Sequence, residues 1–364
     1  MSDLDPKVSI VIPTRNRRAL LAQTLRSVLA QTYDNWEAIV VDDRSSDGTD
    51  EMMAQMSAVD SRLFFLTRAS NNAGANACRN EGFAASRGQY VIFLDSDDFL
   101  HADCVRNRVR EMRRNPDIDF GVFACEAFRE TPGDERVLFN VQTDEHDLDR
   151  MLRLDIAWQT TSPMWTRKTL KQLGPWDEKL LSWQDWEFHI RALTHRLLYQ
   201  YFERPDCYWR MMNPVKESIG ARAFTREHLQ QREFLLVEIE RMITRAQMMN
   251  ERRQRYLAGL YFYHGMKCVD VDPRLATHAW HRAWRRGLIT PLEYAGGMSF
   301  FRCWEWGRTR RWHRDYVLKY WSREVLGTIS KTHLRACYNP QFEESSGDTE
   351  RIADATAQST RAAG

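Results

Sequence analysis

The chain has 364 residues, 43% of them hydrophobic, which is enough for about two domains and a large core and excludes a chain that is disordered throughout. Its 52 basic and 50 acidic residues leave a net charge of +2, so no overall field would recruit nucleic acid. The seven cysteines are odd in number and form no C-x-x-C pair, which argues against a disulfide framework or a zinc site.

The sequence carries no recognisable export or membrane signal. Its first residues, MSDLDPK, lack the pattern of a signal peptide, and no run of about 18 apolar residues could span a bilayer. Scattered cysteines are typical of a reducing compartment. We therefore expect a cytoplasmic protein, either soluble or peripheral at the inner face of the membrane.

Strand and helix patterns alternate over the first 100 residues. Apolar runs predict strands at 7–14, 38–41, 62–68 and 91–94. Helices are predicted between them over 17–33, from Thr49 onward, and over 74–88, the last one ending at Gly88 as its C-terminal cap. Continuous apolar strands separated by helices predict an α/β fold with a mostly parallel sheet and helices on both faces.

Polar side chains follow three of these strands where each strand ends. Ligands of open α/β sheets bind at the carboxyl ends of the strands, so we expect the turn 13–16, the pair Asp42–Asp43 and the cluster 95–98 to form three walls of one cleft. Asp95 and Asp97 have a spacing that can ligate a divalent cation together with phosphate oxygens, although a capped turn with solvated carboxylates is the alternative. Asp43 can accept hydrogen bonds from a ribose hydroxyl or a pyrimidine N3–H. Together these features predict a nucleotide-sugar site.

The second half of the chain changes in character. Residues 119–128 predict one more strand, and a helix is predicted to start near Trp186. Beyond residue 222 the pattern is helical, with an apolar stripe through Leu235, Ile239, Met242, Ala246 and Met249 and two further helices around an Asp-Pro turn. We expect an α/β domain over 1–222, an α-helical domain over 223–340 and a disordered tail over 341–364.

One basic segment is a candidate interaction surface. Residues 302–335 hold nine Lys or Arg against three acidic residues, with four tryptophans interleaved. Such a segment suits an anionic membrane surface, but a packed helix pair with core tryptophans and solvated arginines is the alternative. The sequence leaves both interpretations open.

Four segments in order resemble the motifs of family-2 glycosyltransferases. They are VSIVIPTRNR, SVLAQTYDNWEAIVVDDRSSDGT, NNAGANACRNEGFAASRGQYVIFLDSDD and LGPWDEKLLSWQDWEFHIRA, spread over roughly residues 7–220. The resemblance implies a GT-A fold and inverting transfer of a sugar from a nucleoside diphosphate donor, with UDP- or dTDP-sugars favoured. It also implies a glycan or lipid-linked acceptor, a role in polysaccharide biosynthesis, and Mn²⁺ or Mg²⁺ as cofactor.

The resemblance also assigns site residues. By position, Asp43 matches the residue that reads the pyrimidine, and Pro13 and Arg15 line the same pocket. Arg79 matches a basic residue of the donor site, and Asp95 and Ser96 match its nucleotide-binding residues. Asp95 and Asp97 match the metal ligands, with Asp97 as the direct one. Arg210 or Lys216 is expected to contact the diphosphate.

Asp185 is the predicted general base. Inversion in one displacement requires the acceptor hydroxyl to lose its proton as it attacks, and Asp185 lies at the family's base position. Its alternative role is the N-cap of the following helix, for which Asp is a favoured residue. Members of the family often carry Glu where this chain has Gln184, so the resemblance implies that a second carboxylate for positioning the acceptor is missing.

Two other functions fit parts of the pattern. A haloacid-dehalogenase-like phosphohydrolase also places D-x-D after an apolar strand, although normally on the first strand. A scaffold protein could keep the same fold without turnover, but the complete set of Asp43, Asp95, Asp97 and Asp185 argues against lost chemistry.

Overall fold

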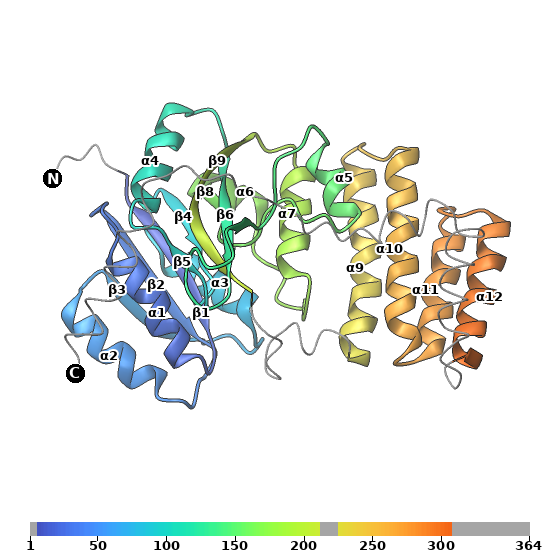
Figure 1. Cartoon of the computed structure of the whole chain (residues 1–364), viewed down its shortest axis with the longest axis horizontal. Helices are drawn as coiled ribbons and strands as arrows, with labels where there is room; N and C mark the ends of the chain where they lie inside the picture. Colours follow the sequence, from blue (N-terminus) through green and yellow to red (C-terminus); the bar gives the residue numbers. More distant parts are fainter. Residues whose placement is uncertain (1–5, 212–224, 308–364) are drawn as a thin grey trace.

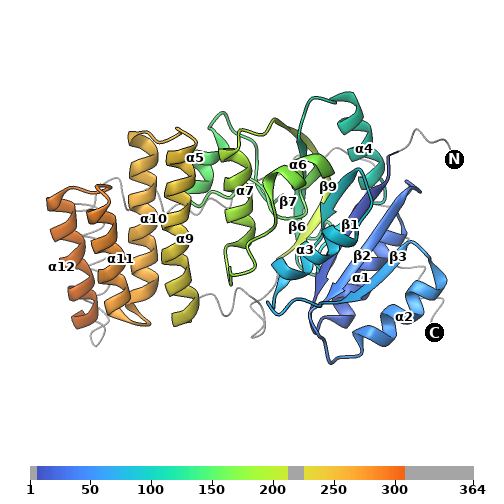
Figure 2. The ribbon, with the colours of Figure 1, turned by 180° about the vertical axis from the view of Figure 1, so that it is seen from behind.

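The computed structural model describes residues 6–211 and 225–307, with side chains described as far as Arg302. Three predicted features lie outside these residues: the diphosphate contact of Lys216, most of the basic segment 302–335, and the tail 341–364. The described part is a mixed sheet with helices on both faces, extended at one end by a row of helices (Figures 1 and 2).

The first half of the sheet is parallel. Strands β1 (Val8–Thr14), β2 (Trp36–Asp42), β3 (Leu63–Thr67) and β4 (Tyr90–Phe93) pair in the order β3-β2-β1-β4. Thr14 lies opposite Asp42 and Asp42 lies opposite Thr67, so the carboxyl ends of these strands are level. This register places the loops after β1, β2 and β4 on one edge, as predicted.

The second half of the sheet is mixed. It continues from β4 through β8 (Pro163–Thr166), β6 (Phe120–Phe128), β9 (Tyr199–Arg210) and β5 (Phe99–Leu100), while β7 (Val137–Leu138) pairs with β6. β8 joins β4 and β6 in antiparallel fashion, whereas β6 and β9 are parallel. As a result β9 ends at Arg210 beside the loop that follows β4.

Helices cover both faces because the strand side chains alternate between two cores. Ile10 and Ile12 pack with α1 (Arg18–Leu29), α2 (Thr49–Val59) and α4 (Cys104–Arg114) on one face. Val11 faces the other core, which includes α5 (Asp147–Leu152), α6 (Arg167–Leu173) and α7 (Gln184–Thr194), while α3 (Ala75–Ala85) packs on β1 and β2. The predicted two-faced α/β fold is confirmed.

The prediction that the 74–88 helix ends at Gly88 is wrong. The helix α3 ends at Ala85, and Ser86 is its C-terminal cap. Gly88 instead lies where the chain passes β1, and a Cβ atom there would be 2.6 Å from the backbone nitrogen of Ser9. The glycine is thus required for close backbone approach rather than for a helix end.

The helical region consists of α9 (Arg226–Arg245), α10 (Glu251–Val269), α11 (Pro273–Arg285) and α12 (Pro291–Gly307) (Figure 1). The predicted stripe on α9 holds through Met242, but the helix stops at Arg245, so Met249 lies in the connection to α10. Leu236 and Ile239 of α9 belong to the same buried core as Phe188 of α7 and Val91 of β4. The predicted domain boundary at 222/223 falls in the undescribed segment, and one apolar core continues across it.

Candidate active site

Ion pairs connect the three predicted walls of the cleft. Arg15, just after β1, lies 3.4 Å from a carboxylate oxygen of Asp43, just after β2. Arg17, two residues on, binds Asp97 after β4 at 2.8 Å. The side chains therefore meet at the edge where the parallel strands end, and Pro13 lies one residue before the end of β1.

Asp43 is held rigidly. Its side chain is buried, with one oxygen accepting from Arg68 Nε and the other from the backbone N–H of Gly74 at 3.0 Å. Arg68 was not predicted for the site, although its position directly after β3 places it on the same edge. Because both oxygens accept from protein donors, the Asp43 carboxylate has a defined orientation at the edge of the sheet.

Arg79 connects the loop that carries Asp95 with the start of the helix that carries the predicted base. It comes from α3, is almost fully buried, and donates to Asp95 Oδ1 at 2.8 Å. A second guanidinium nitrogen donates to Asn76 at 3.0 Å and to Gln184 Oε1 at 3.4 Å, and the group lies 4.6 Å from the Trp176 ring centroid. The neutral amide of Gln184 thus contacts this arginine.

Asp97 combines burial with nearby charges of both signs. Burial raises the pKa of its carboxyl, the adjacent Asp95 adds to the rise, and the positive charge of Arg17 opposes it. Asp95 is about one-third exposed, so the two carboxylates differ in their access to solvent. Ser96 between them is buried. Arg17 was not among the residues predicted for the site.

Arg210 fixes the loop that carries these carboxylates. Its Nε donates to the Asp97 carbonyl at 3.1 Å, and another guanidinium nitrogen donates to Gln23 of α1 at 2.9 Å. Its backbone N–H donates to buried Asp98 at 3.0 Å, and Thr161 donates to the other Asp98 oxygen at 3.0 Å. These bonds place Arg210 at the site, with its guanidinium bound to protein acceptors.

Asp185 lies in the first turn of α7 and is partly buried. The helix begins at Gln184 and its N-cap is Trp183, so the structure does not assign the N-cap position to Asp185. Burial raises the pKa of the Asp185 carboxyl, the positive charge of Arg79 opposes the rise, and Asp95 adds to it. The charges of Arg79 and Asp95 act on Asp185, which links the predicted base to the carboxylate loop after β4.

Oxygen donors at this edge suit a divalent cation, although the number of protein ligands is small. Among the described residues, no group of three His, Cys, Asp or Glu side chains gathers in a way that could hold a metal ion. Asp95 and Asp97 supply two carboxylates, which matches sites where Mg²⁺ or Mn²⁺ is completed by substrate phosphates and water. The donor set therefore fits a metal that arrives with a diphosphate.

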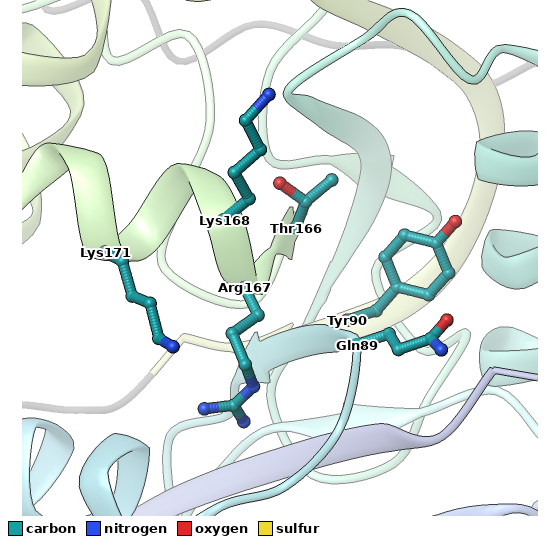
Figure 3. A pocket seen from close by; sticks show the side chains of 6 residues that line it. All are labelled: Gln89, Tyr90, Thr166, Arg167, Lys168 and Lys171. Carbon is teal, nitrogen blue, oxygen red and sulfur yellow. The ribbon is translucent and has the colours of Figure 1, made fainter.

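A separate cavity of about 590 Å³ lies at the opposite edge of the sheet, where β4 begins and β8 ends. Six residues line it: Gln89, Tyr90, Thr166, Arg167, Lys168 and Lys171. Figure 3 shows Lys168 and Lys171 pointing in different directions from α6, and Arg167 is already bonded to Ser86 at 2.6 Å. The basic groups do not converge on one point, and no residue predicted for the site lies there.

Comparison with known proteins identifies the strand-and-helix part of the chain. Residues 9–172 match the family model described as glycosyl transferase family 2. The chain carries a family-2 glycosyltransferase domain. The matched residues include the strand ends that hold Asp43, Asp95 and Asp97, whereas Asp185 lies beyond them.

Curated relatives of the family-2 domain are glycosyltransferases by name. TuaG of Bacillus subtilis is 35% identical over 136 residues, which cover 37% of this chain and 54% of TuaG. The GalNAc(5)-diNAcBac-PP-undecaprenol beta-1,3-glucosyltransferase of Campylobacter jejuni is 36% identical over 95 residues, covering 26% of this chain and 31% of that enzyme. The chain thus spans about half or less of the length of these relatives.

Solved structures extend the likeness to the helical region. Residues 1–349 of S. aureus TarS, in complex with UDP-GlcNAc, give a TM-score of 0.61 at 16% identity and cover 94% of this chain and 98% of that one. The mannosyltransferase PcManGT of Pyrobaculum calidifontis, in complex with GDP-Man and Mn²⁺, gives a TM-score of 0.50 at 15% identity. That match covers 92% of this chain and 86% of PcManGT. The predicted GT-A fold is confirmed.

Proposed function

We propose that the protein is an inverting glycosyltransferase that moves a sugar from a nucleoside diphosphate donor to a glycan or lipid-linked acceptor. The observation that carries the proposal is the grouping, in a family-2 domain, of a fixed carboxylate (Asp43), a paired carboxylate loop (Asp95, Asp97) and a partly buried carboxylate (Asp185). Arg79 lies between the last two groups. One-step displacement needs this combination of donor binding and a base.

Donor binding is assigned to the edge of the parallel strands. Asp43, with Pro13 and Arg15 beside it, would accept hydrogen bonds from the nucleoside, and its fixed orientation would make that recognition selective. Arg79 and Ser96 would lie against the diphosphate. Arg210 remains a proposed diphosphate contact, but its bonds to Asp97 and Gln23 favour a role in fixing the carboxylate loop. Lys216 is outside the described residues.

Asp97 and Asp95 would hold Mn²⁺ or Mg²⁺ together with the donor diphosphate. When bound, the cation would neutralise negative charge on the departing diphosphate. Asp97 would then contact the metal in place of Arg17, and Asp95 would contact it in place of Arg79. PcManGT is in complex with both GDP-Man and Mn²⁺, which supports this assignment.

Asp185 would accept the proton of the acceptor hydroxyl during attack on the anomeric carbon. A raised pKa makes the carboxylate a stronger base, provided that the pH is high enough to ionise it. The positive charge of Arg79 would favour the ionised form of Asp185. Gln184 provides no second carboxylate, so acceptor activation rests on Asp185 alone.

UDP- and dTDP-sugars are the favoured donors. The TarS complex contains UDP-GlcNAc, and the name of the Campylobacter relative specifies an undecaprenol-linked acceptor. These relatives favour assembly of a surface polysaccharide on a lipid carrier. The acceptor class would bring the enzyme to the inner face of the membrane.

The first experiment is a thermal-shift panel of UDP, dTDP and GDP sugars with manganese or with excess chelator. A correct donor at 100 times its Kd should stabilise the protein by about 2.7 kcal/mol with manganese and much less with chelator. Release of nucleoside diphosphate from the same donors measures turnover. Stabilisation by no sugar nucleotide, or binding that is equal in chelator, would contradict the donor or the metal assignment respectively.

Membrane contact through 302–335 remains a separate proposal based on the excess positive charge of that segment. No described helix is long and apolar enough to cross a bilayer. Co-sedimentation with phosphatidylglycerol vesicles tests the proposal, because binding should weaken as salt rises. Absence of binding at low salt would leave the packed-helix alternative.

A further inference from the structure

The first helix of the helical region contacts the turn that precedes Asp185. Helices α7 and α9 lie side by side in both views (Figures 1 and 2). Gln231 of α9 accepts a hydrogen bond from the Leu181 backbone N–H at 2.5 Å and donates one to the Lys179 carbonyl. One side-chain amide therefore binds both a donor and an acceptor of the turn, which fixes the path of its backbone.

Arg232, the next residue of α9, contacts the remainder of the turn. Its Nε donates to the Ser182 hydroxyl at 3.0 Å, and its guanidinium lies 4.8 Å from the centroid of the Trp183 ring. The Arg232 side chain is buried. Two consecutive residues of the helical region thus bind four backbone or side-chain groups of the glycosyltransferase domain, at Lys179, Leu181, Ser182 and Trp183.

Trp183 has a conformation that needs such support. Its φ angle of 60° is in the left-handed region, which costs a non-glycine residue about 1–2 kcal/mol. Its carbonyl accepts the Glu187 N–H at 3.0 Å, so the direction of this residue sets where the first turn of α7 begins. Asp185 is two residues later, and a change at Trp183 would therefore move the carboxylate.

The same turn also reaches the donor side of the site. Gln184 donates to the Leu180 carbonyl at 2.8 Å, and its oxygen accepts from Arg79 at 3.4 Å. Arg79 in turn binds Asp95. A continuous series of contacts therefore leads from α9 through the turn to the groups proposed for catalysis.

We propose that Gln231 and Arg232 are positioning residues, which hold the 179–183 turn in the strained conformation that aims Asp185 at the acceptor. The inference rests on the proposed function, because it concerns the residue assigned as base. It gives the helical region a direct part in the reaction geometry. The contacts on which it rests join α9 to the turn, and none of them is made to Asp43, Asp95 or Asp97.

The first test measures the turn itself. In the whole 364-residue chain, Arg232→Met removes the contacts of the guanidinium with Ser182 and Trp183 and retains most of the side-chain length. Backbone hydrogen exchange of the variant and of the wild type is measured by mass spectrometry. Exchange of the amides of 180–186 should become faster, while Arg286→Met, which removes the ion pair with Glu240 elsewhere on α9, should leave these amides unchanged. Unchanged exchange of 180–186 in Arg232→Met would overturn the inference.

The second test separates positioning from general stability. With the best sugar nucleotide of the panel, Arg232→Met should lower kcat roughly 10- to 100-fold while the donor KM changes far less. The base is misplaced, whereas Asp43 and Asp97 keep their bonds to Arg68 and Arg17. Arg232→Lys keeps a cation beside Trp183 and should recover part of kcat. If Arg232→Met does not fold, Gln231→Ala serves as the second variant, because it removes the bonds of Gln231 to Leu181 and Lys179.

A double-mutant cycle makes the result decisive. When Asp185→Asn is already present, Arg232→Met should lower the remaining rate little further, because the positioned group is gone. An equal loss in both backgrounds would show a structural effect and overturn the inference. Near-normal turnover by Asp185→Asn alone would instead contradict the proposed base, while the exchange experiment would still report whether α9 holds the turn.

Discussion

Asp185 is the single side chain whose loss should affect transfer while leaving donor binding in place. Asp185→Asn keeps the shape of the group but removes the proton acceptor, so transfer should fall roughly 10²–10⁴-fold. Donor binding should remain near wild type, because Asp43, Asp95 and Asp97 are unchanged. Initial rates with a saturating donor, together with calorimetric donor titration, measure the two effects separately.

Glu187, on the same helix, is the matched control for Asp185. Its buried carboxylate forms two bonds of 2.9 Å with Arg191, which also donates to the Pro175 carbonyl at 2.7 Å. Glu187→Gln should therefore cost about 2–3 kcal/mol of stability but little turnover per folded molecule. Equal losses of turnover in Asp185→Asn and Glu187→Gln would reduce Asp185 to a structural residue.

The pKa of Asp185 predicts a trade between stability and activity. Burial raises the pKa in the folded state, whereas the unfolded value is about 4. Between these two values the folded protein binds the additional proton, so the free energy of unfolding decreases as pH rises through this interval. Ionised Asp185 is thus destabilising near neutral pH, although it is the active form.

Asp185→Asn should consequently unfold at a higher temperature than wild type at pH 7.5. The difference should shrink as the pH falls to about 4 and level off below it, where Asp185 is protonated in both states. Thermal unfolding followed by circular dichroism over this range provides the measurement. A variant less stable than wild type at every pH would show that favourable contacts of the carboxylate, such as that with Arg79, outweigh its desolvation.

At the scale of elements, the contact between β1 and the start of β4 leaves no space for a side chain. A Cβ atom on Gly88 would be 2.6 Å from both the backbone nitrogen and the hydroxyl of Ser9 and 2.8 Å from the Lys7 carbonyl. The Gly88 N–H also donates to the Ser9 hydroxyl at 2.7 Å. Because most of these atoms belong to the backbone, the strands themselves would have to move apart.

Gly88→Ala should therefore destabilise the protein by about 1–3 kcal/mol, the usual cost of overpacking. Urea unfolding provides the measurement, and Gln89→Ala at the adjacent exposed position is the control. A Gly88→Ala variant as stable as the control would indicate that this edge of the sheet relaxes easily.

Over the whole molecule, one apolar core connects the glycosyltransferase domain and the helical region. It contains Val91 of the sheet, Phe188 of α7, Leu236 of α9 and Trp280 of α11. Charged contacts add to it, because Arg253 of α10 binds Asp149 of α5 at 2.6 Å. The two parts are therefore expected to unfold together.

Calorimetry should show one cooperative transition for these two parts, and a bound nucleoside diphosphate should shift that entire transition upward. The physical reason is that separating the parts would expose the shared core to water. Two well-resolved transitions, with only one shifted by nucleotide, would show that the helical region folds independently.

The sequence by itself determined the strand–helix alternation and the positions of Asp43, Asp95 and Asp97 at strand ends. Both follow from local patterns, since apolar periodicity sets the element type and a polar residue after a buried strand lies at the sheet edge. It also placed Asp185 near the start of a helix. These features need only a few neighbouring residues.

Only the tertiary structure decided which groups these carboxylates meet. Arg17, Arg68 and Arg79 come from different loops and helices, and their pairing with Asp97, Asp43 and Asp95 depends on the packing of the sheet. The closeness of α9 to the turn before Asp185 is likewise invisible in the sequence, because about 50 residues separate Gln231 from Leu181. Such contacts arise when distant segments share one core, and no local pattern specifies them.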